Sequence, residues 1–288
     1  MGILKFISSN ILYIIWFVIY FTIAWVLLGA NTQSLIIVSI VYGTSITIAL
    51  CPIGEMLLRL IENCRNPATE QERSYLAPIF EEVYQNAKEV NPQLSNAIQL
   101  YIMDAMYVNA FAIGRTTVAV TNGAIETFTA DELKGVLGHE LGHMTYGHTK
   151  ALLLSVIGNF FFSIIVWVLR FLLYIIEGAS SVFASINVVG LVFKFMAFMA
   201  RIIFELSIFL FVNLGEIILA LNSRSNETQA DEFAFNIGFG REQISALYIL
   251  QKIAMNSKLK LSEKMKASHP HTAYRIAHLE KLENESLA

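Results

Sequence analysis

The sequence predicts a mainly α-helical fold with a small β-sheet (α+β), carried on about four transmembrane helices. Its 288 residues are 55% hydrophobic and only 15% charged, which is too apolar for a soluble protein of this size. The apolar residues gather in long runs between segments of mixed charge, so one part of the chain is expected in lipid and another in water. The net charge of −3 offers no basic field to a nucleic-acid backbone, which argues against nucleic acid as a partner.

Residues 1–54 are expected to form a transmembrane hairpin. Ile11 to Leu28 is long enough to span a hydrocarbon core, which needs about 20 residues of helix, and Leu35 to Leu50 follows after a short polar turn. A cleaved signal peptide is the alternative for the first run, but this run exceeds the usual apolar stretch of roughly 7–15 residues. Lys5 precedes the hairpin and its turn carries no charge, so the positive-inside rule places both ends of the hairpin in the cytoplasm.

The rest of the chain alternates between water and lipid. Residues 55–150 and 222–288 are polar and mixed in charge, whereas residues 151–221 form a second apolar region with candidate spans at Ala151 to Leu169 and within Ile186 to Leu221. The last of these contains Lys194, Arg201, Glu205 and Glu216. We expect these charges to reach toward an interface, and a polar path toward a functional site is the alternative.

A metal-binding motif lies in the first polar segment. Thr129 and Glu132 form a capping-box signature followed by apolar residues at helical spacing, so a helix is expected to begin near Ala130. On this helix His139 and His143 are four residues apart, and both imidazoles therefore project from one face and can bind one ion.

Glu140 completes the pattern HExxH and is expected to act as a general base. Neutral imidazole nitrogens suit Zn²⁺, an open coordination position admits water, and a carboxylate can take the proton of that water during attack on a peptide carbonyl. A chance match on a surface helix is the alternative. The capped helix and a compatible third ligand downstream argue against it.

Zinc needs a third protein ligand to make a catalytic site. The scheme HExxHxxGxxH fails, because Tyr146 and Thr149 stand where it requires Gly and His. We instead expect Glu227 to be the ligand, from a helix that Asn222 or Ser223 would cap, with Glu232 as the next residue to test. A solvated acidic face is the alternative for this helix.

Several residues are expected to support the site. Asp231 lies one turn after Glu227 and can accept a hydrogen bond from a ligand histidine. His148 is expected to be rotated off the ligand face of its helix and to play a structural or supporting part. His269 could donate to a tetrahedral oxyanion or could be a plain loop histidine.

Tyr107 to Gly123 contains two β-prone runs joined at Gly114-Arg115, which predicts a hairpin just before the motif helix. An exposed edge of this hairpin could add an extended substrate as a further strand. A plain core hairpin is an equally good interpretation.

Coordination of one ion by both polar segments requires them to lie on the same side of the membrane. Residues 151–221 must then cross the membrane an even number of times, and two crossings give four transmembrane helices in all, with a cytoplasmic site. The two polar segments, residues 55–150 and 222–288, would together form the catalytic domain.

With these residues assembled, the chain resembles the HtpX family of membrane zinc endopeptidases, relatives of the CAAX prenyl endoproteases. The resemblance rests on NAFAIG from Asn109, on HELGH from His139, on SRSNETQAD from Ser223 and on the tail SHPHTAYRI from Ser268. It implies a zincin fold of the gluzincin type, a zinc cofactor, and a site facing the cytoplasm in a bacterial inner membrane. It also implies a quality-control role on misassembled membrane proteins or unfolded polypeptides.

Two positions depart from the family pattern. Members commonly have Arg where this chain has Asn226, and often an acidic residue where it has His148, so local support of the site is expected to differ. The alternatives are a prenyl-type endoprotease with a narrow C-terminal substrate, and a non-enzymatic transporter or metal-binding membrane protein. The capped HExxH helix argues against the latter, because transport needs no base beside two metal ligands.

Overall fold

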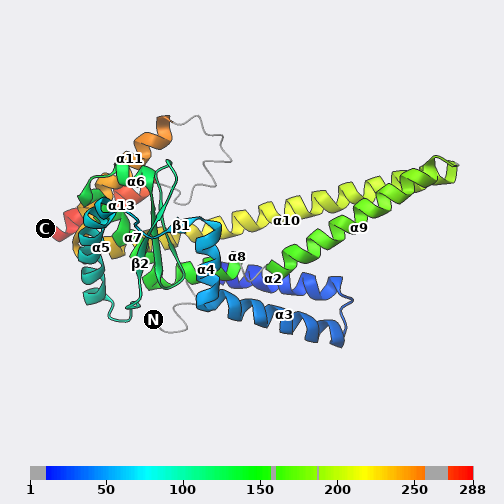
Figure 1. Ribbon diagram of the computed structural model, residues 1–288, viewed down its shortest axis with the longest axis horizontal. Coiled ribbons are helices and arrows are strands. Elements are labelled where there is room, and N and C mark those ends of the chain that lie inside the picture. The colour runs from blue at the N-terminus through cyan, green and yellow to red at the C-terminus, as the bar shows by residue number, and fades with distance from the viewer. Residues whose placement is uncertain (1–10, 157–159, 187, 257–271, 288) are drawn as a thin grey trace. The chain divides into compact units, whose positions relative to one another are not determined.

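The computed structural model describes residues 11–156, 160–186, 188–256 and 272–287. Within them the fold is α+β, as predicted, and consists of helices and one small four-stranded sheet (Figure 1). The helices are α2 (Ile11–Leu27), α3 (Thr32–Leu50), α4 (Pro52–Ile61), α5 (Glu70–Val90), α6 (Asn122–Thr127), α7 (Ala130–Tyr146), α8 (His148–Val156), α9 (Phe160–Ala184), α10 (Val188–Ala234), the π-helical η1 (Phe235–Phe239), α11 (Gly240–Asn256) and α13 (Thr272–Leu287). The strands are β1 (Cys64–Arg65), β2 (Gln99–Met103), β3 (Ala110–Ile113) and β4 (Thr117–Thr121).

The chain folds as two units, and each is built from stretches far apart in the sequence. The sheet unit consists mainly of Thr47–Ser155 and Asn222–Ala288, and the helical unit of Leu12–Ile46 and Val156–Leu221. The sheet unit therefore joins the two polar segments of the chain, which supports the expectation that they form one domain.

The sheet has the strand order β1-β2-β4-β3. β2 runs parallel to β4, while β1 pairs antiparallel with β2 and β3 antiparallel with β4. The predicted hairpin is confirmed, because β3 and β4 pair from Ala110 opposite Val120 to Ile113 opposite Thr117. β3 is consequently an edge strand, and α7 packs against it.

The core of the sheet unit lies between the sheet and the helices α5, α7 and α11. Val83 of α5, Ile102 and Val120 of the sheet, and Leu137 of α7 are all fully buried in one cluster. Burial of such a side chain contributes about 1.5–3 kcal/mol. This packing fixes α7, which carries the metal motif, against the edge of the sheet.

α10 is one continuous helix from Val188 to Ala234. The expectation that Asn222 or Ser223 caps a new helix is therefore wrong: the polar residues that begin there extend the helix instead of starting one. After Ala234 the chain turns through η1, where Gly238 has a φ of 92°, a left-handed conformation that favours glycine. The side-chain amide of Asn86 donates to the Ile237 carbonyl at 3.1 Å and ties this turn to α5.

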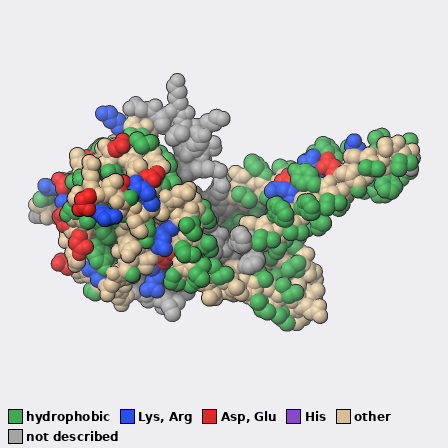
Figure 2. Space-filling view, in the orientation of Figure 1, with side chains coloured by type: hydrophobic (Ala, Val, Ile, Leu, Met, Phe, Trp, Pro, Cys, Tyr) green, Lys and Arg blue, Asp and Glu red, His purple; other side chains and the backbone are tan. Residues whose placement is uncertain are grey.

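Three helical stretches among the described residues are long and apolar enough to cross a membrane: Thr32–Leu50, Ser163–Ala184 and Val188–Asn213. Ile14–Leu27 is a shorter apolar helix. The predicted span from Ala151 to Leu169 overlaps the second of these stretches only in part, because the apolar part of α9 runs on to Ala184. Figure 2 shows hydrophobic side chains over most of the visible face of α9 and α10, with charged side chains part of the way along.

These charges form two ion pairs between α9 and α10. Arg170 contacts Glu205 through two bonds of 2.7 Å, and Arg201 Nε lies 2.6 Å from Glu177 Oε2. Arg201 and Glu205 thus pair with side chains of the neighbouring helix. The sequence analysis expects them to reach toward an interface and does not predict these pairs. The pairs tie the two helices together within their apolar stretches.

Candidate metal centre

The motif helix begins as predicted. Thr129 Oγ1 accepts from the Glu132 backbone N–H at 3.3 Å, and the Glu132 carboxylate accepts from the Thr129 N–H at 2.9 Å, which completes a capping box. α7 ends at Tyr146 because Gly147 adopts a left-handed φ of 78°. His139 and His143 lie on the buried inner turns of this helix.

Glycines let α10 approach this part of α7 closely. A Cβ at Gly142 would lie 2.8 Å from the Ala230 Cα, a distance that real Cβ atoms essentially never show. A Cβ at Gly138 would lie 3.1 Å from Ile237 Cδ1. Because Glu227 is one turn before Ala230 on α10, this close approach brings its carboxylate to the two histidines.

Three side chains meet in the gap between these helices. The Nε2 atoms of His139 and His143 are 3.1 Å apart, and the two oxygens of Glu227 each lie 3.4 Å from one of them. Two ligand atoms bound tetrahedrally at about 2.1 Å from one metal ion are about 3.4 Å apart. The spacing of the donor atoms therefore fits a single metal ion.

The charge balance of the site fits a divalent ion as well. Glu140, Glu227 and Asp231 are buried together with the single guanidinium of Arg275. Three carboxylates and one guanidinium leave a formal charge of −2, and buried charge without compensation is costly. A divalent cation would bring this group to neutrality.

The pKa values of the buried side chains reflect the same excess of negative charge. Burial and Arg275 each lower the pKa of His139, but contacts with Asp231 and Glu227 outweigh both and raise this pKa to about 9. Burial raises the pKa of Asp231, yet Arg275 and His139 more than reverse this and hold it well below its usual range. Asp231 is therefore ionised and can only accept hydrogen bonds.

Asp231 orients the first histidine. Its Oδ1 accepts from His139 Nδ1–H at 2.9 Å, so in the neutral form of the ring, which is the form that binds a metal, the Nε2 lone pair is turned toward His143 and Glu227. The Gln243 amide donates to the same carboxylate at 2.9 Å. Asp231 thus occupies the supporting position expected for it.

His148 contacts the second histidine. Its Nδ1 lies 3.0 Å from His143 Nδ1, and burial lowers the pKa of His148 to about 3, which keeps the ring neutral. The expectation that helical rotation carries His148 away does not apply, because α7 ends before it and the chain turns at Gly147. Burial also lowers the pKa of His143.

Arg275 of α13 lies in the candidate site and is not among the residues predicted from the sequence. It is only 3% exposed, and its Nη1 lies 2.9 Å from Glu227 Oε2 while its Nε donates to Asp231 Oδ2 at 2.7 Å. One guanidinium therefore joins the carboxylate beside the histidines to the carboxylate behind them. A signal was present, since Arg275 lies four residues before Leu279 and so shares the buried face of its helix.

The remaining predicted residues are placed as follows. Glu140 is buried beside His139 and close enough to Arg275 to raise the pKa of the guanidinium. Asn226 is buried, and its side-chain oxygen finds no partner within the described part of the chain. Glu232 lies 2.9 Å from His278 Nε2 and does not join the cluster of donor atoms, and His269 lies outside the described residues.

A buried His-His-Glu group on an HExxH helix, in a chain with long apolar helices, defines a membrane metallopeptidase. The chain belongs to peptidase family M48, whose profile matches residues 70–283. Protease HtpX of Shewanella baltica strain OS185 is 28% identical over 276 residues, covering 88% of this chain and 91% of the relative. The Protease HtpX homolog of Methylacidiphilum infernorum is 26% identical over 248 residues, covering 83% and 77%.

Among solved structures, S. mikatae Ste24p is similar with a TM-score of 0.47 and 17% identity. That match covers 96% of this chain and 66% of the Ste24p chain. The curated relatives are named as HtpX proteases, which favours the HtpX resemblance over the prenyl-type endoprotease and transporter alternatives.

Proposed function

We propose that the protein is a zinc endopeptidase that cleaves misassembled membrane proteins and unfolded polypeptides at the cytoplasmic face of a bacterial inner membrane. The observation that carries this proposal is the meeting of His139, His143 and Glu227 beside the buried carboxylate of Glu140. Two imidazoles and one carboxylate with room for a further ligand are the donor set of catalytic zinc sites.

The roles follow from the contacts. His139, His143 and Glu227 would hold the zinc, which when bound makes a water more acidic and polarises the scissile carbonyl. Glu140 would accept a proton from the attacking water and deliver it to the leaving amine nitrogen. Arg275 would position Glu227 by binding one of its oxygens.

The second histidine has a matching arrangement. If the Nε2 lone pair of His143 binds the zinc, the Nδ1–H of the same ring would donate to His148 Nδ1. His148 Nε2 would then carry a hydrogen, and this buried atom has no partner within the described residues. His148 would in this way fix the orientation of His143.

The edge of the sheet supports an extended substrate. Among the described strands, β3 pairs only with β4, and it packs against the motif helix α7. A peptide added to the free edge of β3 would be bound by its main chain, without regard to its side chains. Such binding suits flexible or unfolded polypeptides.

The topology supports a cytoplasmic site. α9 and α10 supply two apolar stretches in succession, so the chain can leave the site at Lys150 and return to it at Glu227 on the same side. Reporter fusions at Cys64 and Lys150 are expected to report the cytoplasm, and a fusion at Thr32 the outside. Opposite signals at Lys150 and Ala288 would rule out shared coordination.

Replacement of Glu140 by Gln tests the proposed reaction, because the amide cannot take a proton from water. Cleavage of casein by the detergent-purified protein is expected to fall by about 10²–10⁴, while the zinc content is unchanged. Glu89→Gln, on the exposed end of α5, is the matched control. Near-normal cleavage by Glu140→Gln, or cleavage that survives a chelator, would overturn the proposal.

A further inference from the structure

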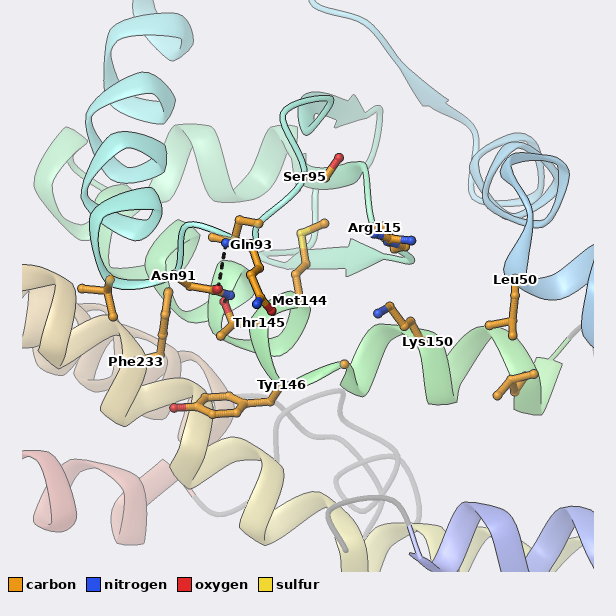
Figure 3. Close-up of a pocket in the computed structure, with 14 residues that line it drawn as sticks. Leu50, Asn91, Gln93, Ser95, Arg115, Met144, Thr145, Tyr146, Lys150 and Phe233 are labelled. Atoms are coloured by element: carbon orange, nitrogen blue, oxygen red, sulfur yellow. Dashed lines mark hydrogen bonds between the residues drawn. The ribbon is translucent and has the colours of Figure 1, made fainter. Parts of the chain in front are cut away.

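A cavity of about 660 Å³ lies in the sheet unit, beside the C-terminal end of the motif helix α7. Asn91, Gln93 and Ser95 line one part of it, and Arg115 and Lys150 line another (Figure 3). Neither the two ligand histidines nor Glu227 is among the lining residues. The cavity therefore adjoins the motif helix at Met144 without including the three proposed ligands.

Hydrogen bonds to the turn between β3 and β4 fix the backbone beside the two basic residues. Glu55 of α4 accepts from the backbone N–H groups of Arg115 at 2.6 Å and Thr116 at 3.1 Å, at the turn between β3 and β4. Thr149 of α8 donates to the carbonyl of Gly114 in the same turn at 2.6 Å. These bonds fix the turn to α8 and so bring Arg115 next to the residue that follows Thr149, which is Lys150.

The cavity carries unbalanced positive charge. Within the described residues no carboxylate forms an ion pair with the side chain of Arg115 or Lys150. The nearest acid, Glu55, already accepts hydrogen bonds from the turn. Burial lowers the pKa of Lys150 and the charge of Arg115 lowers it further, while Glu55 offsets this only in part, so a bound anion would favour the charged form of Lys150.

Apolar side chains at the ends of the membrane-spanning sequence also line the cavity, on the side of Arg115 and Lys150 (Figure 3). Leu50 lines it and is the last residue of α3, a helix long and apolar enough to cross a membrane. Leu154 also lines it, on α8, which leads toward α9. The cavity thus combines two cations with apolar side chains at the ends of the membrane segments, where lipid headgroups lie.

From this arrangement we propose that Arg115 and Lys150 bind the phosphate of an anionic phospholipid, whose acyl chains lie along Leu50 and Leu154. Two cations on one wall match a lipid with net negative charge better than a zwitterionic one. The apolar side chains distinguish a lipid from a free phosphate ion, which would gain nothing from the two leucines. The site is independent of the proposed reaction.

Native mass spectrometry of the full-length protein can count the bound lipids. The sample is the Glu140→Gln protein, which avoids self-cleavage, in detergent with equal amounts of phosphatidylglycerol and phosphatidylcholine. The double variant Arg115→Gln/Lys150→Gln is compared with Arg241→Gln/Lys281→Gln, which removes two charges on α11 and α13, outside the cavity. Each Lys or Arg near an anionic headgroup strengthens lipid binding. Removal of both is therefore expected to lower the affinity for phosphatidylglycerol about 30-fold.

The expected result is one tightly retained phosphatidylglycerol in the parent protein and in the control, absent from the double variant. Inorganic phosphate at millimolar concentration is expected not to displace it. Equal retention in all three proteins, or no preference over phosphatidylcholine, would overturn the proposal. Displacement by inorganic phosphate alone would show a small-anion site and overturn the lipid assignment. Thermal unfolding of each variant checks that loss of lipid does not reflect loss of fold.

Discussion

Ion pairs in two regions of this protein are built differently. In the metal centre, the side chains of Arg275, Glu227 and Asp231 are 3%, 5% and 1% exposed and are linked in one network. Between α9 and α10, Arg170 and Glu205 form one of two neighbouring ion pairs, and their side chains are 38% and 34% exposed. The first network holds the carboxylates of the candidate metal centre in place, whereas the second joins two long apolar helices. The same kind of contact therefore orders side chains in one region and joins helices in the other.

The largest effect is expected from Arg275→Gln. The change leaves Glu227 and Asp231 buried without their cation, and breaking a buried pair in this way costs about 3–5 kcal/mol. The thermal midpoint and the zinc content of the purified protein are both expected to fall. Arg241→Gln, which breaks an exposed pair with Glu283, is the control and should change neither. An Arg275→Gln protein as stable and as rich in zinc as the control would remove Arg275 from the account.

A smaller effect is expected from Gly142→Ala, which adds a methyl group where α7 and α10 are closest. The new Cβ would lie 2.8 Å from the Ala230 Cα, so α10 must shift away at a cost of about 1–3 kcal/mol. Because Glu227 moves with α10, the affinity for zinc should fall together with the thermal midpoint. Gly178→Ala in α9, where the Cβ meets nothing within 4 Å, is the matched control. Unchanged zinc affinity in Gly142→Ala would show that the close helix contact does not position the ligand.

The smallest effect is expected for the pair between α9 and α10. A double-mutant cycle of Arg170→Leu and Glu205→Leu should give a coupling energy of about 1 kcal/mol, and the double variant should be nearly as stable as the parent. Thermal unfolding in one detergent measures all four proteins. A coupling as large as the loss from Arg275→Gln would erase the difference between the two regions.

Most of the candidate site could be predicted because its information is local. His139, Glu140 and His143 lie within one and a half turns of a helix, and the capping box at Thr129 specifies where that helix begins. Arg275 could not be assigned a role in this way, because its contacts depend on how α13 packs against α11 and across to α10. Its charge suggested solvent, and only the position of Leu279 on the same helix face pointed inward.

The errors in the fold have similar causes. The polar residues from Asn222 onward look like the start of a helix, but nothing in them breaks a helix, so α10 continues through them. His148 was placed by assuming that α7 continues, whereas the left-handed Gly147 ends it and turns the chain back toward His143. In both cases the polar character of the segment is predicted correctly, and the error lies in the position at which a helix ends.

The central claim is that Glu227, and not another acid of the same helix, completes the zinc site. Metal analysis of three purified proteins tests it most directly: the parent, Glu227→Gln and Glu232→Gln, whose glutamate contacts His278 instead. If Glu227 is the third ligand, we expect about one zinc per chain in the parent and in Glu232→Gln, and almost none in Glu227→Gln. One zinc per chain in Glu227→Gln, or its loss in Glu232→Gln alone, would contradict the account.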